Sequence, residues 1–177
     1  MSKLAILQYP DERLHTVAQA VPQVDAGIRR LVGDMAQTMY AADGIGLAAT
    51  QVNVHLRVIL VDISEDRSQL LVMINPEVIK MGGSAEFEEG CLSVPDVYEK
   101  VKRAAWIRLR ALDINGKPFE VQADGLKAMC IQHELDHLQG MVFVEHLSPL
   151  NQARILSTLA KPKSARRKNR IRGKLAV

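Results

Sequence analysis

One helix constrains the fold of this chain more than any other segment. The sequence HELDH at 133–137, placed on a helix, brings His133 and His137 one turn apart on one face. Glu134 follows about 100° further round, near a site that both imidazoles can reach. Apolar residues flank this face on both sides, so the helix is expected to be buried and enclosed by the rest of the chain.

The limits of this helix are marked at both ends. Asp124 is a candidate N-cap and Gly140 a candidate stop, which predicts a helix over 125–139. Buried histidines and carboxylates need partners, and a shared metal ion supplies them. The alternative is a solvated face with two histidines and two acids and no metal. The apolar rows that argue against it are Leu126, Met129 and Cys130 on one side and Ile131, Leu135 and Leu138 on the other.

A His-Glu-x-x-His metal site needs a third protein ligand, and no residue downstream of the motif fits a known position for it. The metzincin pattern would place a histidine where this chain has Phe143, and the last acidic residue, Glu145, is too close to His137 for the gluzincin pattern. His146 follows an apolar run at 141–144 that predicts a strand, which disfavours it as a ligand. The third ligand is therefore expected upstream.

The two cysteines differ in their surroundings. Cys91 lies between Gly90 and a polar stretch, at a break between predicted strands, where a turn could hold a thiolate. Cys130 lies on an apolar row of the helix and fits a small buried hydrophobe, which is also the alternative interpretation of Cys91. A Cys-His-His set with an open fourth position is typical of catalytic rather than structural metal sites.

The remaining periodicity predicts an α+β domain, with mostly antiparallel strands packed around the central metal-binding helix and with an N-terminal and a C-terminal helix. Asp25 and Ser148-Pro149 mark the starts of the two outer helices, and Asn115-Gly116 marks a hairpin. The predicted helices cover 26–41, 125–139 and 149–160, and the predicted strands 57–62, 70–74, 85–89, 104–112, 119–122 and 141–144.

Charge divides the chain into a body and a tail. The 177 residues carry a net charge of +3, but eight basic and no acidic residues follow from Lys161, which leaves 1–160 at −5. We therefore expect a single catalytic domain at 1–160 and a basic tail at 161–177, which is either a solvated end or a contact to phosphate backbone. No apolar run is long enough for a membrane span and no signal peptide opens the chain, so a cytoplasmic location is expected.

Small residues fill the stretch GIGLAATQ at 44–51. They would let another chain approach the backbone closely, although a tight turn before a strand would explain them as well. This stretch, EGCLS at 89–93 and QHELDHL at 132–138 together resemble, in order and spacing, the three motifs of the peptide deformylase family. LQYPDERL at 7–14 is similar to the family's N-terminal segment, and the resemblance covers about 4–160.

The resemblance implies removal of the formyl group from the N-terminal formyl-methionine of newly synthesised polypeptides, with release of formate. Cys91 and the two histidines of the helix would hold the metal, and metal-bound hydroxide would attack the formyl carbon. Glu134 would serve as general acid and base. The Gln51 side-chain amide and the Leu92 backbone N–H would donate hydrogen bonds to the developing oxyanion.

The resemblance also implies a substrate site. The backbone of Ile45 and Gly46 could pair with the peptide as a strand does. A pocket for the methionine side chain would be lined by Ile45, Phe87, Leu126 and Met129 with the His133 ring, although ordinary core packing would explain the last three apolar residues equally well. Glu89 belongs to this substrate set and is expected to pair with Arg103, unless both are solvated.

The implied cofactor is one ferrous ion per chain, which zinc, nickel or cobalt can replace, because one thiolate and two imidazoles suit all four. The implied partners are formyl-methionyl nascent peptides and the ribosome, whose RNA the basic tail could contact. Nothing in the sequence demands a dimer, so a monomer is expected.

Two other functions fit part of the sequence. A zinc endopeptidase would share the helix but take its third ligand downstream, and it would have no need of the stretch at 44–51. An RNA-binding protein with a structural metal would need a fourth protein ligand, for which the sequence offers no clear candidate.

Overall fold

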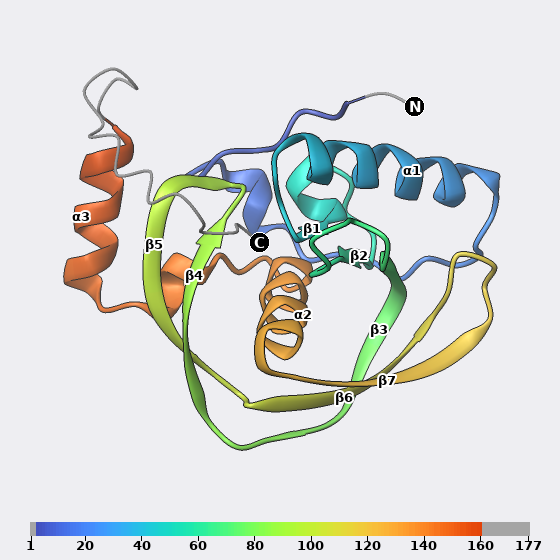
Figure 1. Cartoon of the computed structure of the whole chain (residues 1–177). Coiled ribbons are helices and arrows are strands. Elements are labelled where there is room, and N and C mark those ends of the chain that lie inside the picture. Colours follow the sequence, from blue (N-terminus) through green and yellow to red (C-terminus); the bar gives the residue numbers. More distant parts are fainter. Residues whose placement is uncertain (1–2, 161–177) are drawn as a thin grey trace.

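The computed structural model describes residues 3–160, which form two antiparallel sheets and three α-helices (Figure 1). The helices are α1 (Ala26–Ala41), α2 (Gly125–Leu138) and α3 (Pro149–Leu159), with short 3-10 turns η1 (Glu12–His15), η2 (Ala49–Val52) and η3 (Phe143–His146). The strands are β1 (Gly46–Ala48), β2 (Val58–Val61), β3 (Leu71–Gly82), β4 (Ala85–Cys91), β5 (Val94–Arg103), β6 (Trp106–Leu112) and β7 (Pro118–Asp124).

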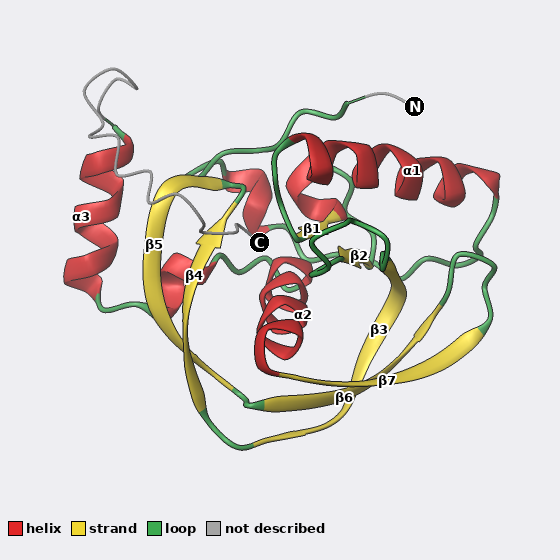
Figure 2. Cartoon of the chain, in the orientation of Figure 1, coloured by secondary structure: helices red, strands yellow, loops and turns green. Residues whose placement is uncertain are grey.

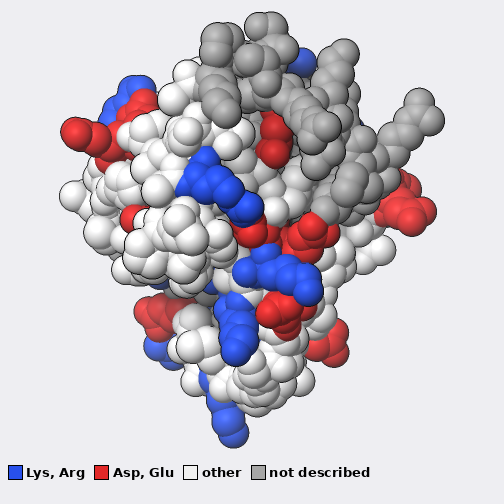
Figure 3. Space-filling model, turned by 90° about the vertical axis from the view of Figure 1, so that its left-hand side faces the viewer, with Lys and Arg blue, Asp and Glu red and all other residues white. Residues whose placement is uncertain are grey.

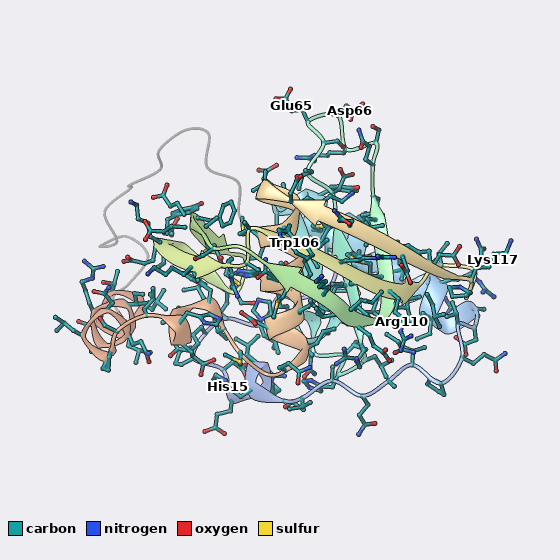
Figure 4. All side chains as sticks on the ribbon, turned by 90° about the horizontal axis from the view of Figure 1, so that it is seen from below. His15, Glu65, Asp66, Trp106, Arg110 and Lys117 are labelled. Carbon is teal, nitrogen blue, oxygen red and sulfur yellow. The ribbon has the colours of Figure 1, made fainter. Side chains whose placement is uncertain are left out.

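The strands wrap around α2. Five of them form one sheet in the order β1-β2-β3-β6-β7, and β4 pairs with β5 in a separate hairpin (Figure 2). Every neighbouring pair is antiparallel. Viewed from below, the broad β6–β7 ribbon covers α2 and carries Lys117 at its tip (Figure 4). The predicted α+β class, with antiparallel strands around a central helix, is confirmed.

Packing against the sheet holds α2 in place. Its apolar residues join the largest core cluster, together with side chains of β1, β2, β3 and β6. Gly140 has φ +73° after the helix, and the carbonyl oxygen of His15 lies 2.4 Å from the place a Cβ would occupy, so only glycine fits there. Asp124 occupies the N-cap position as predicted, but its side chain accepts no cap hydrogen bond.

The outer helices follow their sequence signals. The Asp25 carboxylate accepts from the Ile28 N–H at 2.9 Å, and α1 covers the range predicted for it. The Ser148 hydroxyl accepts from the Asn151 N–H at the start of α3. Helix α3 packs Ile155 into a cluster with the β4–β5 hairpin, while α1 covers β1 and β2 in a second cluster.

Strand β3 is longer than predicted. Asn75-Pro76 indicated the end of a strand at 74, whereas β3 continues to Gly82. The pairing with β6 shifts its register between Ile74 and Glu77, and Asn75 adopts φ +51°. Proline fits such an irregularity because no ladder hydrogen bond is needed from its nitrogen. The turn signal therefore marked a bulge within a strand.

The strand predicted at 141–144 is wrong. These residues lead into the 3-10 turn η3, and the Glu145 carboxylate accepts from the Val142 N–H at 2.7 Å to close that turn. Phe143 and its apolar neighbours are buried against the β4–β5 hairpin, which explains the apolar run without strand pairing. Strand β5, in contrast, had no counterpart in the prediction, since 94–103 mixes charged and apolar residues.

Candidate metal centre

Two elements bring together the three side chains that the sequence predicts as ligands. Helix α2 supplies His133 and His137, and β4 ends at Cys91 against the helix. The Cys91 Sγ lies 3.3 Å from His137 Nε2, and one ligand atom from each of the three residues lies within 4.8 Å of the others. All three side chains are buried, so the site is shielded from bulk water.

The donors fit a divalent metal ion. His133 Nε2 is buried and has no hydrogen-bond partner among residues 3–160. Burial lowers the pKa of His137, which keeps that ring neutral and able to coordinate. Burial raises the pKa of the Cys91 thiol, and the Glu134 carboxylate raises it further. A bound cation would favour the thiolate, so metal binding at this site should release a proton.

Glu89 orients one of the two histidines. Its Oε2 lies 2.8 Å from His133 Nδ1, and its side chain is fully buried. Burial alone would raise the pKa of Glu89, but hydrogen bonds from Arg103 and His133 lower it to about 2. The ionised carboxylate accepts the Nδ1 proton and thereby leaves the Nε2 lone pair of His133 facing Cys91 and His137.

A buried ionic network extends from this contact. The Arg103 guanidinium donates to both Glu89 oxygens, at 2.7 and 2.9 Å, and to Asp136 at 2.6 Å. His146 Nε2 lies 2.6 Å from the same Asp136 oxygen. The predicted pairing of Glu89 with Arg103 is confirmed, and the solvated alternative is wrong because both side chains are buried. His146 therefore lies in this network and not among the three candidate ligands.

We expect Glu89→Gln to weaken metal binding. The neutral amide accepts the Nδ1 proton of His133 less strongly, and it leaves the Arg103 guanidinium without one carboxylate. Loss of such a partner typically lowers metal affinity by about 10–100-fold. Competition with a metal chelator measures the affinity of the folded protein. Unchanged affinity would show that the contact does not tune the site, and Glu86→Gln, on an exposed residue of the same strand, is the matched control.

The Gln51 side chain reaches the Cys91 thiol from η2. Its Oε1 accepts from the Ala48 N–H at 2.8 Å, which turns its amino group towards Cys91 Sγ at 3.6 Å and Ser93 Oγ at 3.2 Å. The amide orientation is therefore fixed, with its N–H groups at the metal site. Leu92 follows Cys91 in the turn between β4 and β5.

The N-terminal segment ties these two loops together. The Leu7 N–H donates to the Gln51 carbonyl at 2.8 Å, and the Tyr9 N–H donates to the Ser93 carbonyl at 2.8 Å. Between them, the Gln8 amide donates to the Leu92 carbonyl at 3.1 Å. The segment 7–9 thus fixes the distance between η2 and the β4–β5 turn.

Glu134 is the buried acid closest in sequence to the ligands. Neither of its oxygens has a hydrogen-bond partner among residues 3–160. Burial raises its pKa, and the carboxylates of Glu89 and Asp136 raise the pKa further. A carboxyl group that is isolated in this way can both accept and return a proton.

The residues predicted to meet substrate lie in two places. Ile45 and Met129 are buried in the core cluster around α2, and Phe87 packs against the same cluster. Leu126 is 40% exposed one turn before Met129 on α2. Gly46 begins β1, which is an edge strand and pairs on one side only within the described sheet.

Several residues around the site were not singled out by the sequence. The Ser93 N–H approaches Cys91 Sγ at 3.4 Å, and the Thr50 hydroxyl donates to the His137 carbonyl at 3.1 Å. The contact of Glu89 with His133 was also missed. Its signal was available, because Glu89 and Cys91 are two residues apart on a strand and therefore lie on one face.

Comparison with known proteins places this geometry in a family. The family model for polypeptide deformylases matches residues 3–153. Peptide deformylase 2 of Nitrosomonas europaea is 61% identical over 161 residues, which are 91% of this chain and 87% of that protein. The crystal structure of a peptide deformylase from Legionella pneumophila is 44% identical, with a TM-score of 0.85 over 90% of this chain and 99% of that one. A peptide deformylase from Ehrlichia chaffeensis, in complex with actinonin, gives a TM-score of 0.87 at 37% identity over 90% of this chain and 96% of that one.

Proposed function

Because this chain belongs to the polypeptide deformylase family, we propose that Cys91, His133 and His137 hold its catalytic metal ion and that Glu134 transfers protons in the reaction. The enzyme is a metal-dependent hydrolase that removes the N-terminal formyl group of nascent peptides. This assignment rests on one observation. The buried Cys91 thiol and two buried imidazoles converge beside the Glu134 carboxyl group, which has no hydrogen-bond partner among residues 3–160.

The chain's own residues divide the work of hydrolysis. A bound divalent ion supplies Lewis acidity, which brings the pKa of a water molecule from ~15.7 towards ~7. Glu134 accepts the proton of the attacking water and delivers it to the nitrogen that leaves when the C–N bond breaks. The Gln51 amide and the Leu92 N–H donate to the carbonyl oxygen as it becomes negative. The products are formate and a free amino terminus.

The substrate would approach along the free edge of β1. Gly46 has no side chain to obstruct a peptide that pairs there, and α2 packs directly beside β1. In this arrangement Ile45, Phe87 and Met129 line the pocket for the methionine side chain, with Leu126 at its exposed rim. Glu89 contributes by holding the His133 ring that closes the pocket.

We expect Met129→Trp to raise the Michaelis constant for formyl-Met peptides with a smaller effect on kcat. The larger ring would fill part of the proposed pocket, whereas Met129 itself is not among the candidate ligands. Steady-state formate release over a range of formyl-Met-Ala-Ser concentrations measures both constants. An unchanged Michaelis constant in a folded, metal-loaded variant would contradict the pocket.

The resident ion is proposed to be ferrous iron, with zinc, nickel or cobalt able to replace it. A mixed thiolate and imidazole set accepts all of these ions. Metal analysis and formate release after purification without oxygen test the assignment. Iron in the active fraction would support it, and full recovery of activity with zinc alone would refute it.

The tail at 161–177 lies outside the described residues, and we propose that it contacts ribosomal RNA. On the described face formed by α3 and the β4–β5 hairpin, basic and acidic side chains alternate (Figure 3). Among them Lys100 pairs with Glu86 and Arg154 with Glu99. The positive charges on this face are therefore largely paired with negative ones. The basic tail would provide most of the attraction to the phosphates of the RNA. The protein would act as a cytoplasmic monomer of one catalytic domain, 1–160.

We expect truncation after Ala160 to abolish salt-sensitive ribosome binding and to leave formate release from a short peptide unchanged. Each lost phosphate contact lowers the slope of log affinity against log salt by about 0.7–0.9. Co-sedimentation with ribosomes at several salt concentrations measures this slope. Equal binding of the full-length and truncated proteins would exclude the tail as the contact.

The formate assay also separates this function from the two rivals. Formyl-Met-Ala-Ser should yield formate with its peptide bonds intact. Cleavage of unformylated peptides would instead favour an endopeptidase, and RNA binding that survives Glu134→Gln, without any hydrolysis, would favour a non-catalytic protein.

A further inference from the structure

A cavity lies behind α2, on the side away from the metal centre. Its volume is about 620 Å³, within the range of roughly 300–1,000 Å³ typical of small-molecule sites. Helix α2 contributes Gln132, Leu135 and Asp136 to it, and helical spacing places these residues on a different face from Glu134 and the two histidines. The cavity is therefore separate from the site where formate is released.

The wall of this cavity is mostly apolar. Val78 and Met81 of β3 form part of its rim and are 43% and 57% exposed, while Ile107 and Leu135 lie deeper. Isolated exposed apolar side chains are common, but here they surround a hollow. A ligand with an apolar body would remove this surface from water.

Most polar groups in the cavity already have partners. Gln132 donates to the carbonyls of Ala104 and Ala128 and accepts from the Ala104 N–H. The Arg103 guanidinium is shared between Asp136 at 2.6 Å and Glu89 at 2.7 Å. These groups therefore have little capacity left for a charged ligand.

Lys102 is the exception among the charged lining residues. It is exposed at the cavity edge on β5, and its ammonium group has no hydrogen bond or ion pair with any residue in 3–160. One unpaired cation beside an apolar hollow complements a ligand that has one negative charge and an apolar body.

We propose that this cavity binds a small monocarboxylate with an unbranched apolar chain, whose carboxylate pairs with Lys102 and whose chain lies against Val78, Met81 and Leu135. Such a ligand would also contact Arg103, which links the cavity to Glu89 and so to His133. A ligand in the cavity would thus be connected to the metal centre through Arg103 and Glu89 without occupying that centre.

The single tryptophan of the chain gives a direct readout. Trp106 Cζ2 lies 2.9 Å from the place a Cβ on Gly82 would occupy, and Gly82 lines the cavity. A decanoate with bromine at its terminal carbon should quench Trp106 fluorescence saturably, because a heavy atom quenches on contact. The titration is run with the full chain below the micelle concentration of the probe.

Three variants test the assignment. Lys102→Gln should weaken the apparent affinity for the brominated decanoate roughly threefold to fivefold, the loss typical of a partly exposed ion pair. Lys117→Gln, at the remote tip of the β6–β7 hairpin, should leave it unchanged. Ala104→Leu should reduce binding by filling the cavity. The corresponding brominated alcohol should bind more weakly and should not distinguish Lys102→Gln from the native protein.

Saturable quenching that is weakened by Lys102→Gln but not by Lys117→Gln would support the proposal. Three results would overturn it: no saturable quenching with the native protein, equal effects of the two lysine variants, or inhibition of formate release without any quenching of Trp106. The last would place the carboxylate at the metal centre instead.

Discussion

The Glu134→Gln protein is expected to bind its metal as the native protein does and to release formate about 10²- to 10⁴-fold more slowly, the usual contribution of a general acid–base group. The amide keeps the shape of the carboxyl group but cannot accept the proton of the attacking water. Glu134 is not among the candidate ligands, and its two oxygens have no partners in residues 3–160. The substitution should therefore leave the fold and the metal affinity intact.

Single-turnover formate release and metal analysis on the same sample separate chemistry from metal loss. The decrease should appear in kcat, because the proposed role of Glu134 is to accept the proton of the attacking water and not to bind the peptide. A metal-loaded Glu134→Gln protein with native kcat would contradict the role of Glu134 as the base. If the Glu134→Gln protein loses its metal together with its activity, Glu134 would instead have a structural role in the metal site.

Cys91→Ala is expected to remove both the metal and the activity. In the proposed site the Cys91 side chain is one of three protein donors, so its loss should lower the metal affinity by more than the roughly 10–100-fold that follows from removing an outer-shell partner. The buried thiol also lies 3.3 Å from His137 Nε2, and alanine removes this contact. The metal content per chain, measured by elemental analysis, and the rate of formate release should decrease together.

The second cysteine provides the matched control. Cys130 is buried on α2, and its thiol donates to the Ile45 carbonyl at 3.5 Å but belongs to no metal-binding group within residues 3–160. Cys130→Ala should retain one ion per chain. Loss of the metal from the Cys130→Ala protein, to the same extent as from Cys91→Ala, would contradict the assignment of Cys91 as the third ligand.

The central helix was predictable because its signals are local. The spacing of His133 and His137, the apolar rows beside them and the glycine at 140 all lie within 125–140. The helix at 26–41 was predictable for the same reason, since Asp25 caps it and its apolar stripe is regular. For Cys91, the choice over Cys130 followed from the contrast between a turn and an apolar helix row.

What the sequence did not reveal depends on contacts between distant segments. Glu89 reaches His133 across 44 positions, and Arg103 reaches Asp136 across 33. No local pattern encodes these pairs. The run at 141–144 has the composition of a strand but packs its apolar side chains against the β4–β5 hairpin as part of a 3-10 turn. Tertiary packing outweighed local propensity there.

Stepwise return of metal to the metal-free enzyme tests whether the activity depends on one ion held by Cys91, His133 and His137. Ferrous iron is added without oxygen in increments below one equivalent, while formate release from formyl-Met-Ala-Ser is followed in each sample. A single buried site formed by Cys91, His133 and His137 predicts that activity rises in proportion to bound ion and stops rising at one ion per chain. Full activity in the metal-free protein, or a rise that continues to two ions per chain, would contradict it.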